Sequence, residues 1–460
     1  MENIRQLLSR EQCEYIYKNA LETLSKVGVY CENKQTVDEL SAKTSIKYDN
    51  KRIFFDAAKV SDFFQWPKNK VSPASVPGFS VSNHWNAHAL CDPAANKPRP
   101  ASEQEAIDMA KLSDSLGSKD VPIPVSPGNI PPQLNTLACE KIALTHTKNL
   151  GGCLTATDDY EIESLVQMYQ IAKRRYLLAI EPLISPLRLN SANMDMYFKY
   201  RHRNDFDITI FAAIPMAGAT APLALPACLI MALAESLALD YIFGTLSDNK
   251  HRMFIYRLEP FDLHSGNIVF GSPEWILFKQ AINEVLFYLT GEIPRGGSFR
   301  TTAKNVDGQA IAQVTAAFIW QTAMGARHFG AMGQMCNDQV WSPVLAMFEK
   351  ELLGFGERLC QGLNNCWLDE DPIGAITGGL TENNFLTEDG TLNVMRNMYW
   401  TGKLFSNESL NTWLGNGARD ANQKAWDEAQ KIIKQNDFIL DENQREEIEL
   451  AYKKAAARYK

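Results

Sequence analysis

The sequence lacks the features of several protein classes. It contains no Cys-x-x-Cys pair, and its nine cysteines and seven histidines are not grouped at the spacing of zinc ligands. We therefore expect reduced thiols in a reducing cytosol and no metal site. Acidic residues outnumber basic ones, 54 to 46, which gives a net charge of −8. This argues against nucleic acid as the main partner, because the sequence has no excess of Lys or Arg to bind a phosphate backbone.

Membrane-directing segments are also lacking. The opening residues are polar and contain no apolar stretch of the kind found in signal peptides. Residues 211–234 carry no charge, but Pro215, Pro222, Pro226 and Gly218 would break a spanning helix. We therefore expect a buried strand, a tight loop and the start of a buried helix in this segment, and a cytoplasmic protein without a membrane span.

The composition is that of a soluble globular chain. Apolar residues make up 45% of the 460 positions and charged residues 22%. Such a length suggests one large domain with appendages, or two to three domains.

Short apolar runs alternate with amphipathic helical stretches over most of the chain, which predicts a parallel sheet of α/β type. The starts of the runs are spaced by about 36 residues, near the roughly 31 per unit of a (β/α)₈ TIM barrel. The eight candidate strands are 121–126, 149–155, 177–183, 208–214, 252–258, 293–298, 326–332 and 373–378. Helices are predicted between them, for example over 159–175 and 307–324.

The regions outside the repeating pattern predict two appendages. Residues 1–100 are expected to form an N-terminal α+β appendage, whose first helix begins after Ser9 and runs over 10–26. The barrel is expected over 101–405, opening with a helix capped by Ser102 and Glu105. Residues 406–460 are expected to form a C-terminal helical extension, because charges of both signs crowd its end.

In such a barrel the active site lies at the carboxyl ends of the strands. Glu181 stands in an otherwise apolar run, where a carboxylate is costly to desolvate without a partner. It is a candidate catalytic residue, although a buried ion pair with a neighbouring strand is the alternative. The loop 215–222 is rich in small residues, so its backbone can approach a ligand, and Thr220 is a candidate cap for the next helix.

The densest polar cluster follows the sixth predicted strand. Gly296 and Gly297 precede a helix and present free N–H groups, which indicates an anion site that Arg300 or Lys304 completes. After the fifth strand, His264 is a further candidate. Near the seventh strand lie three more polar candidates, His328, Gln334 and Asn337. The candidate aromatic residues at strand ends are Tyr256, Phe261, Phe299 and Trp341, and such rings can form a cage for a quaternary ammonium.

Several of these segments together resemble the trimethylamine methyltransferase family, in its branch that lacks pyrrolysine. The residues that carry the resemblance are Ser185-Pro186-Leu187, the loop 215–222 with Ala234-Glu235 downstream, and Gly296-Gly297 followed by Ala303-Lys304, Asp307 and Gln309. In pyrrolysine-bearing members that residue lies near the segment that matches 333–337, which here reads Gly-Gln-Met-Cys-Asn.

The resemblance implies a barrel that moves a methyl group from a methylamine to the cobalt of a separate corrinoid protein. Members without pyrrolysine are similar to demethylases of glycine betaine, proline betaine and carnitine, so we expect a carboxylated quaternary amine, glycine betaine first, that leaves as dimethylglycine. We expect Glu181, His328 and Asn337 to be catalytic. The substrate site is assigned to Tyr256, Phe261, His264, Gly297, Phe299, Arg300, Lys304, Gln334 and Trp341, and the corrinoid-facing loop to Met216, Gly218 and Thr220. A homo-oligomer is expected on base rates.

Three other interpretations stay open at this point. The barrel could act on another methylated compound, such as a sulfonium. It could bind betaine without transferring a methyl group. It could also be an unrelated lyase or hydrolase, which would need a metal or paired catalytic carboxylates.

Overall fold

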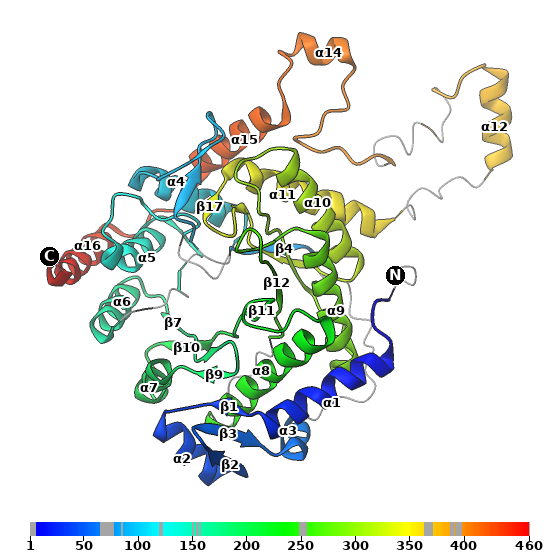
Figure 1. Cartoon of the computed structure of the whole chain (residues 1–460). Helices are drawn as coiled ribbons and strands as arrows, with labels where there is room; N and C mark the ends of the chain where they lie inside the picture. The colour runs from blue at the N-terminus through cyan, green and yellow to red at the C-terminus, as the bar shows by residue number, and fades with distance from the viewer. Residues whose placement is uncertain are drawn as a thin grey trace.

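The computed structural model describes residues 6–64, 78–83, 86–118, 123–149, 151–152, 156, 158–247, 255–362, 371–386, 391 and 398–459. The chain is a mixed α/β structure of helices and several small sheets. In Figure 1 most of the short strands lie toward the inside of a ring and helices form most of its outside, whereas the strands of the first 60 residues, in blue, lie at its outer edge.

The first helix has the predicted bounds. Helix α1 spans Arg10–Lys26, and Ser9 caps it in a capping box with Gln12. Its buried face contains Ile16, Ala20 and Leu24, and the helix packs against α8 (Leu225–Leu246) and α9 (Pro273–Thr290). The N-terminal helix is therefore held on the outside of the ring by apolar contacts (Figure 1).

A small sheet follows α1. Strands β1 (Val29–Tyr30), β2 (Ile46–Asp49) and β3 (Arg52–Phe55) pair antiparallel, with helices α2 (Lys34–Lys43) and α3 (Ala57–Phe64) beside them. The sheet continues into the later chain, because β1 pairs parallel with β9 (Arg188–Leu189), which itself pairs with β8 (Leu183–Ile184).

The strands inside the ring pair in parallel, as the alternating pattern predicts. Strand β7 (Leu177–Ile180) pairs with β10 (Asp207–Ile210), and β11 (Met216–Ala217) with β12 (Glu259–Asp262). Strand β15 (His328–Gly330) lies between β14 (Gly296–Ser298) and β4 (Ser80–Val81). Beyond these, β17 (Val340–Trp341) pairs parallel with β5 (Ala89–Cys91), and Ala87 bridges Val125. Short antiparallel partners β6 (Pro98–Arg99), β13 (Asn267–Ile268) and β16 (Gln334–Met335) complete these sheets.

Four of the predicted strands are confirmed: 177–183 contains β7, 208–214 overlaps β10, 293–298 contains β14 and 326–332 contains β15. The run 121–126 contributes only the bridge at Val125, and 149–155 falls partly outside the described residues. The fifth strand begins later than predicted, with β12 at Glu259 directly after the run 252–258.

The eighth predicted strand is wrong. Residues 373–378 lie in helix α12 (Pro372–Thr381), whose Ile373 and Leu380 are exposed. Asp371 caps this helix and Pro372 occupies its first turn, a start signal that overrides the strand-like apolar run. On the side away from β14, β15 pairs with β4, from a segment assigned to the N-terminal appendage. The division at residue 100 stays a prediction, and this pairing favours an earlier boundary.

The remaining helices surround the strands. The capping box at Ser102 and Glu105 is confirmed at the start of α4 (Glu103–Ser115), and Asp307 caps α10 (Gly308–Ala323). The described elements that follow in chain order are η1 (Pro132–Leu134), α5 (Asn135–His146), α6 (Asp159–Ile171), α7 (Ser191–Tyr200), α11 (Pro343–Gln361), α14 (Leu410–Gly415) and η3 (Ala457–Tyr459).

Two charged helices near the end of the chain are confirmed, α15 (Ala421–Gln435) and α16 (Glu442–Ala456), the latter capped by Asp441. Helix α15 packs against α4 and α11, and α16 against α5 and α6. They therefore cover the outside of the ring, whereas α12 and α14 project from it (Figure 1).

Helix α8 is long and apolar enough to cross a membrane by length and composition alone, but 83% of its most apolar window is buried inside the protein. It is a core helix that packs with α1, as expected for the uncharged segment 211–234. The cysteines of the described ranges are free thiols, namely Cys13, Cys31, Cys91, Cys139, Cys228, Cys336 and Cys360.

Candidate functional site

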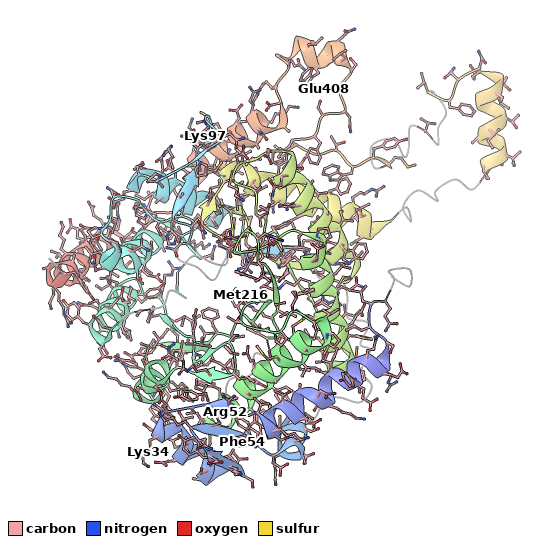
Figure 2. The ribbon with its side chains drawn as sticks, viewed as in Figure 1. Lys34, Arg52, Phe54, Lys97, Met216 and Glu408 are labelled. Atoms are coloured by element: carbon pink, nitrogen blue, oxygen red, sulfur yellow. The ribbon has the colours of Figure 1, made fainter. Side chains whose placement is uncertain are left out.

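A pocket of 260 Å³ opens where β7 and β10 end. Its volume suits a ligand smaller than a drug-sized molecule. Figure 2 shows one of its lining residues, Met216, near the centre of the ring. The pocket is lined by Glu181, Leu183, Ile184, Ser185, Phe211, Ala212, Ala213, Ile214, Met216, Thr220 and Arg257. Glu181 and Phe211 directly follow their strands, so the pocket lies at the carboxyl ends of parallel strands, where an α/β active site is expected.

Glu181 presents its carboxylate to this pocket. The predicted alternative, an ion pair with a neighbouring strand, is not formed among the described residues. Only the main-chain oxygen of Glu181 accepts a hydrogen bond, from Asn193 Nδ2 at 2.6 Å. Burial raises the pKa of Glu181, and the charge of Arg257 partly opposes that shift. A carboxylate in this position can attract a cationic ligand.

Arg257 is the second charged residue of the pocket lining, and sequence reasoning missed it. It lies two residues before β12 and is half-buried. Burial and the neighbouring positive charge of Arg300 lower the pKa of Arg257, whereas Glu259 and Glu181 act in the opposite direction. The signal was present in the sequence, because Arg257 interrupts an apolar run just as Glu181 does.

Arg300 forms an ion pair with a carboxylate of its own chain, that of Asp338. Its Nε donates to Asp338 Oδ2 at 2.8 Å, with the two side chains 7% and 15% exposed, and its guanidinium lies 4.8 Å from the centre of the Phe270 ring. Cys336, Asn337 and Asp338 have φ values of 51°, 56° and 66°, a left-handed turn that costs energy in non-glycine residues. The turn places Asp338 against Arg300 and leaves the buried Asn337 Oδ1 without a hydrogen-bond partner.

A second buried pair lies nearby. Glu259 accepts hydrogen bonds from Trp275 Nε1 and Lys279 Nζ, each at 2.7 Å. Lys279 is therefore also paired within the protein.

The segment of the predicted anion site is a strand. Gly296, Gly297 and Ser298 form β14 in register with β15. The two amides that follow Gly297 donate within the protein, Ser298 N to Gln321 Oε1 and Phe299 N to the oxygen of Gly330, both at 3.0 Å. The exposed Lys304 donates to Thr302 O at 2.8 Å.

Three of the predicted cage aromatics are buried in the core. Phe299 stacks on Phe318 and contacts the tilted ring of Phe329. Trp341 Nε1 donates to Met332 O at 2.8 Å, and the Tyr256 hydroxyl donates to Leu229 O at 2.9 Å. Phe261 is half-buried in β12. The aromatic residue that does line the pocket is Phe211, which the prediction missed although it ends a predicted strand.

The polar candidates are spread over several places. His328 begins β15, is exposed, and has its ring nitrogens 2.9 Å from Ser80 Oγ and 3.1 Å from Ser82 Oγ. His264 is exposed in the turn after β12, and Gln334 is buried in β16. None of the three lines the described pocket.

The loop that begins with Met216 contributes Met216 and Thr220 to the pocket lining. Thr220 Oγ1 accepts from Met216 N at 2.9 Å and so closes the loop. The predicted helix cap is wrong, because α8 begins later and its N-cap is Ala224. Gly218, with φ 97°, lies beside Leu223 and the main chain of Phe261.

Comparison with known proteins identifies the family. The trimethylamine methyltransferase (MTTB) family matches residues 2–458. The chain belongs to the trimethylamine methyltransferase family. A relative in Desulfitobacterium hafniense (strain Y51), a glycine betaine methyltransferase, is 22% identical over 437 residues, covering 88% of each chain. The resemblance predicted from the sequence motifs is therefore confirmed.

In this member of the trimethylamine methyltransferase family, two separate motifs meet beside the pocket. Ser185 lines the pocket, and Glu235, 2% exposed in α8, accepts its hydroxyl hydrogen bond. No group of three His, Cys, Asp or Glu residues suitable for a metal ion occurs within the described ranges.

Proposed function

We propose that the chain transfers a methyl group from a quaternary amine, glycine betaine first, to the Co(I) corrinoid of a partner protein and releases dimethylglycine. The observation that carries this proposal is that Glu181 and Phe211 line the same pocket, whose other described lining residues are mostly apolar. A quaternary ammonium has no N–H donor, so a carboxylate and an aromatic face are the groups that stabilise it. The family match and the glycine betaine methyltransferase relative support the same substrate class.

The architecture we propose is a (β/α)₈ barrel whose first strand contains β4. The parallel pairs β4–β15–β14, β11–β12 and β10–β7 would be arcs of one ring, and the parallel bridge from Ala87 to Val125 a further contact within it. This arrangement places Glu181, Phe211 and Arg257 at one mouth.

Demethylation of a quaternary amine needs little acid–base catalysis by the protein. A quaternary nitrogen already carries a full positive charge, so the amine leaves as a neutral tertiary amine with the electron pair of the broken N–CH₃ bond. The docked corrinoid supplies the nucleophile. The pocket must fix the direction of the N–CH₃ bond and exclude water, which its apolar lining at Ala212, Ala213 and Ile214 favours.

The partner would dock over this mouth. Ile184 and Ile214 of the pocket lining are 46% and 36% exposed, where an acceptor protein would approach. Leu223, Leu225 and Leu263 are exposed as well, by 39–66%. Exposed apolar side chains at a pocket mouth support such an interface. Met216, Gly218 and Thr220 stay assigned to the loop that faces the corrinoid.

The other assignments of the sequence stay proposals. Asn337 has a buried acceptor beside the Arg300–Asp338 pair, which supports a role near the site. His328 is proposed as catalytic on its sequence position alone. A cytoplasmic location and a homo-oligomer are proposed as before.

Methyl transfer to free cob(I)alamin, followed by absorbance, tests the function. The substrates are glycine betaine, proline betaine, carnitine, trimethylamine and tetramethylammonium. We expect methylcobalamin from a betaine and none from trimethylamine. Transfer from trimethylamine alone would contradict the proposal, and betaine binding without transfer under any acceptor condition would favour a binding protein.

A further inference from the structure

We infer that Arg257 binds the carboxylate of a zwitterionic substrate, with Glu181 facing the cationic end in the same pocket. This inference rests on the proposed function, since it names the groups that recognise the substrate. It assigns carboxylate recognition to Arg257 instead of Arg300 and the segment at Gly296 and Gly297.

The first support is the composition of the pocket lining. Among the described residues of the lining, Glu181 and Arg257 are the charged ones, one of each sign, and the others are apolar or carry a hydroxyl. The two do not form a direct ion pair with each other. A pocket with one acidic and one basic side chain that are not paired matches a ligand that carries both charges.

The second support is that the neighbouring cations are already paired. Arg300 is bonded to Asp338, and Lys279 to Glu259. Arg257 makes no hydrogen bond or ion pair with any residue of the described ranges, so its guanidinium N–H groups are available. Arg300 therefore fits the role of a structural residue, and Arg257 that of an anion receptor.

The third support is energetic. A half-buried guanidinium without a hydrogen-bonded anion is costly, and Arg300 adds like-charge repulsion. An incoming carboxylate removes both costs, and the planar guanidinium can hold it through two parallel N–H···O bonds. A ligand with a cation alone relieves neither cost. The pocket should therefore select a betaine over a simple tetraalkylammonium.

Calorimetric binding with the full chain and no corrinoid tests this inference. The ligands are glycine betaine and tetramethylammonium, and the variants are Arg257→Gln and Arg175→Gln. Arg175 is a matched control, because it is an arginine in an exposed ion pair with Asp207 at the opposite end of β10. We expect Arg257→Gln to weaken betaine binding by roughly 10- to 100-fold, the value of a charged hydrogen-bonded contact. Tetramethylammonium affinity should stay within about threefold or improve, since a neighbouring positive charge is lost.

Equal losses for both ligands in Arg257→Gln would overturn the carboxylate role, as would equal affinity of the unmodified protein for the two ligands. Circular dichroism of Arg257→Gln separates misfolding from lost binding. If that variant is unfolded, Arg257→Lys replaces it, and unchanged betaine selectivity in Arg257→Lys together with loss in Arg300→Gln would also overturn the inference. Selective betaine binding that depends on Arg257, without methyl transfer, would reject the proposed function but keep this inference.

Discussion

Glu235 holds Ser185 at the wall of the pocket. Its Oε2 accepts the Ser185 hydroxyl at 2.7 Å, and its Oε1 accepts the Leu187 N–H, also at 2.7 Å. These two residues are 50 positions apart in the chain, and each belongs to a motif that carries the family resemblance. One buried carboxylate therefore fixes the loop after β8 against helix α8, and it acts as a positioning residue.

Glu235→Gln should make stability less dependent on pH. Burial raises the pKa of Glu235 to about 7 from 4.5, so the folded protein favours the protonated acid. The unmodified protein therefore loses stability as the pH rises from about 4.5 through 7, by about 3 kcal/mol at most. The amide cannot ionise but can still accept from Leu187 N–H. In thermal melts, the melting temperature of Glu235→Gln relative to that of the unmodified protein should rise between pH 5 and pH 8.

The control is Glu447→Gln, which changes an exposed glutamate of α16. Its melting temperature should follow that of the unmodified protein at both pH values. A difference between Glu235→Gln and the unmodified protein that does not change with pH would show that Glu235 does not titrate in this range.

Glu181→Gln should weaken binding of a cation. At effective dielectric constants near 20, loss of a charge a few ångströms from a quaternary nitrogen corresponds to about 1–2 kcal/mol after solvent screening, or roughly 5- to 30-fold in Kd. Tetramethylammonium binding, measured by calorimetry, reports this effect without the carboxylate. In the unmodified protein affinity should fall as the pH is lowered through the raised pKa of Glu181, because the protonated acid is neutral.

In Glu181→Gln, the affinity for tetramethylammonium should not change over the same pH range, because the amide does not titrate. Parallel pH curves for the two proteins would assign the titrating group to another residue.

The Arg300–Asp338 pair should be strongly coupled. Asp338 lies in the left-handed region, which Asn tolerates, so Asp338→Asn removes the charge without a new backbone cost. Leaving Arg300 buried and unpaired should cost about 3–5 kcal/mol of unfolding free energy. A double-mutant cycle with Arg300→Gln, measured by urea unfolding, should give a coupling of about 1–3 kcal/mol.

The matched control is a cycle over the exposed pair Arg175–Asp207, which uses the same two residue types. Its coupling should stay below about 1 kcal/mol, because water screens both charges. Similar coupling in the two cycles would mean that burial adds nothing to the Arg300 pair.

Local signals in the sequence predicted local structure well. The residues that cap α1, α4 and α16 satisfy amides of their own first turn, so Ser9, Ser102 and Asp441 mark helix starts independently of the rest of the chain. The same kind of signal at Asp371 and Pro372 marks the start of α12, which is why 373–378 is helix and not the predicted strand.

Short strands were harder to predict. β4 covers only Ser80 and Val81, too few residues for an alternating pattern to stand out, and its partner β15 lies far along the chain. Pairing between such distant segments depends on the geometry of the whole sheet, which no local window of sequence contains.

The sequence by itself determined the family and the parallel α/β pattern and indicated Glu181 as a candidate, because motifs, hydrophobic periodicity and a charge in an apolar run are properties of neighbouring residues. Only the tertiary structure decided how the charges are paired. Arg300 and Arg257 are the same residue type, and the sequence does not show which of them is paired. The left-handed turn at residues 336–338 brings Asp338 to Arg300. Arg257 lines the pocket instead. Burial and partner geometry set the energy of a charge, and both arise only when distant segments pack together.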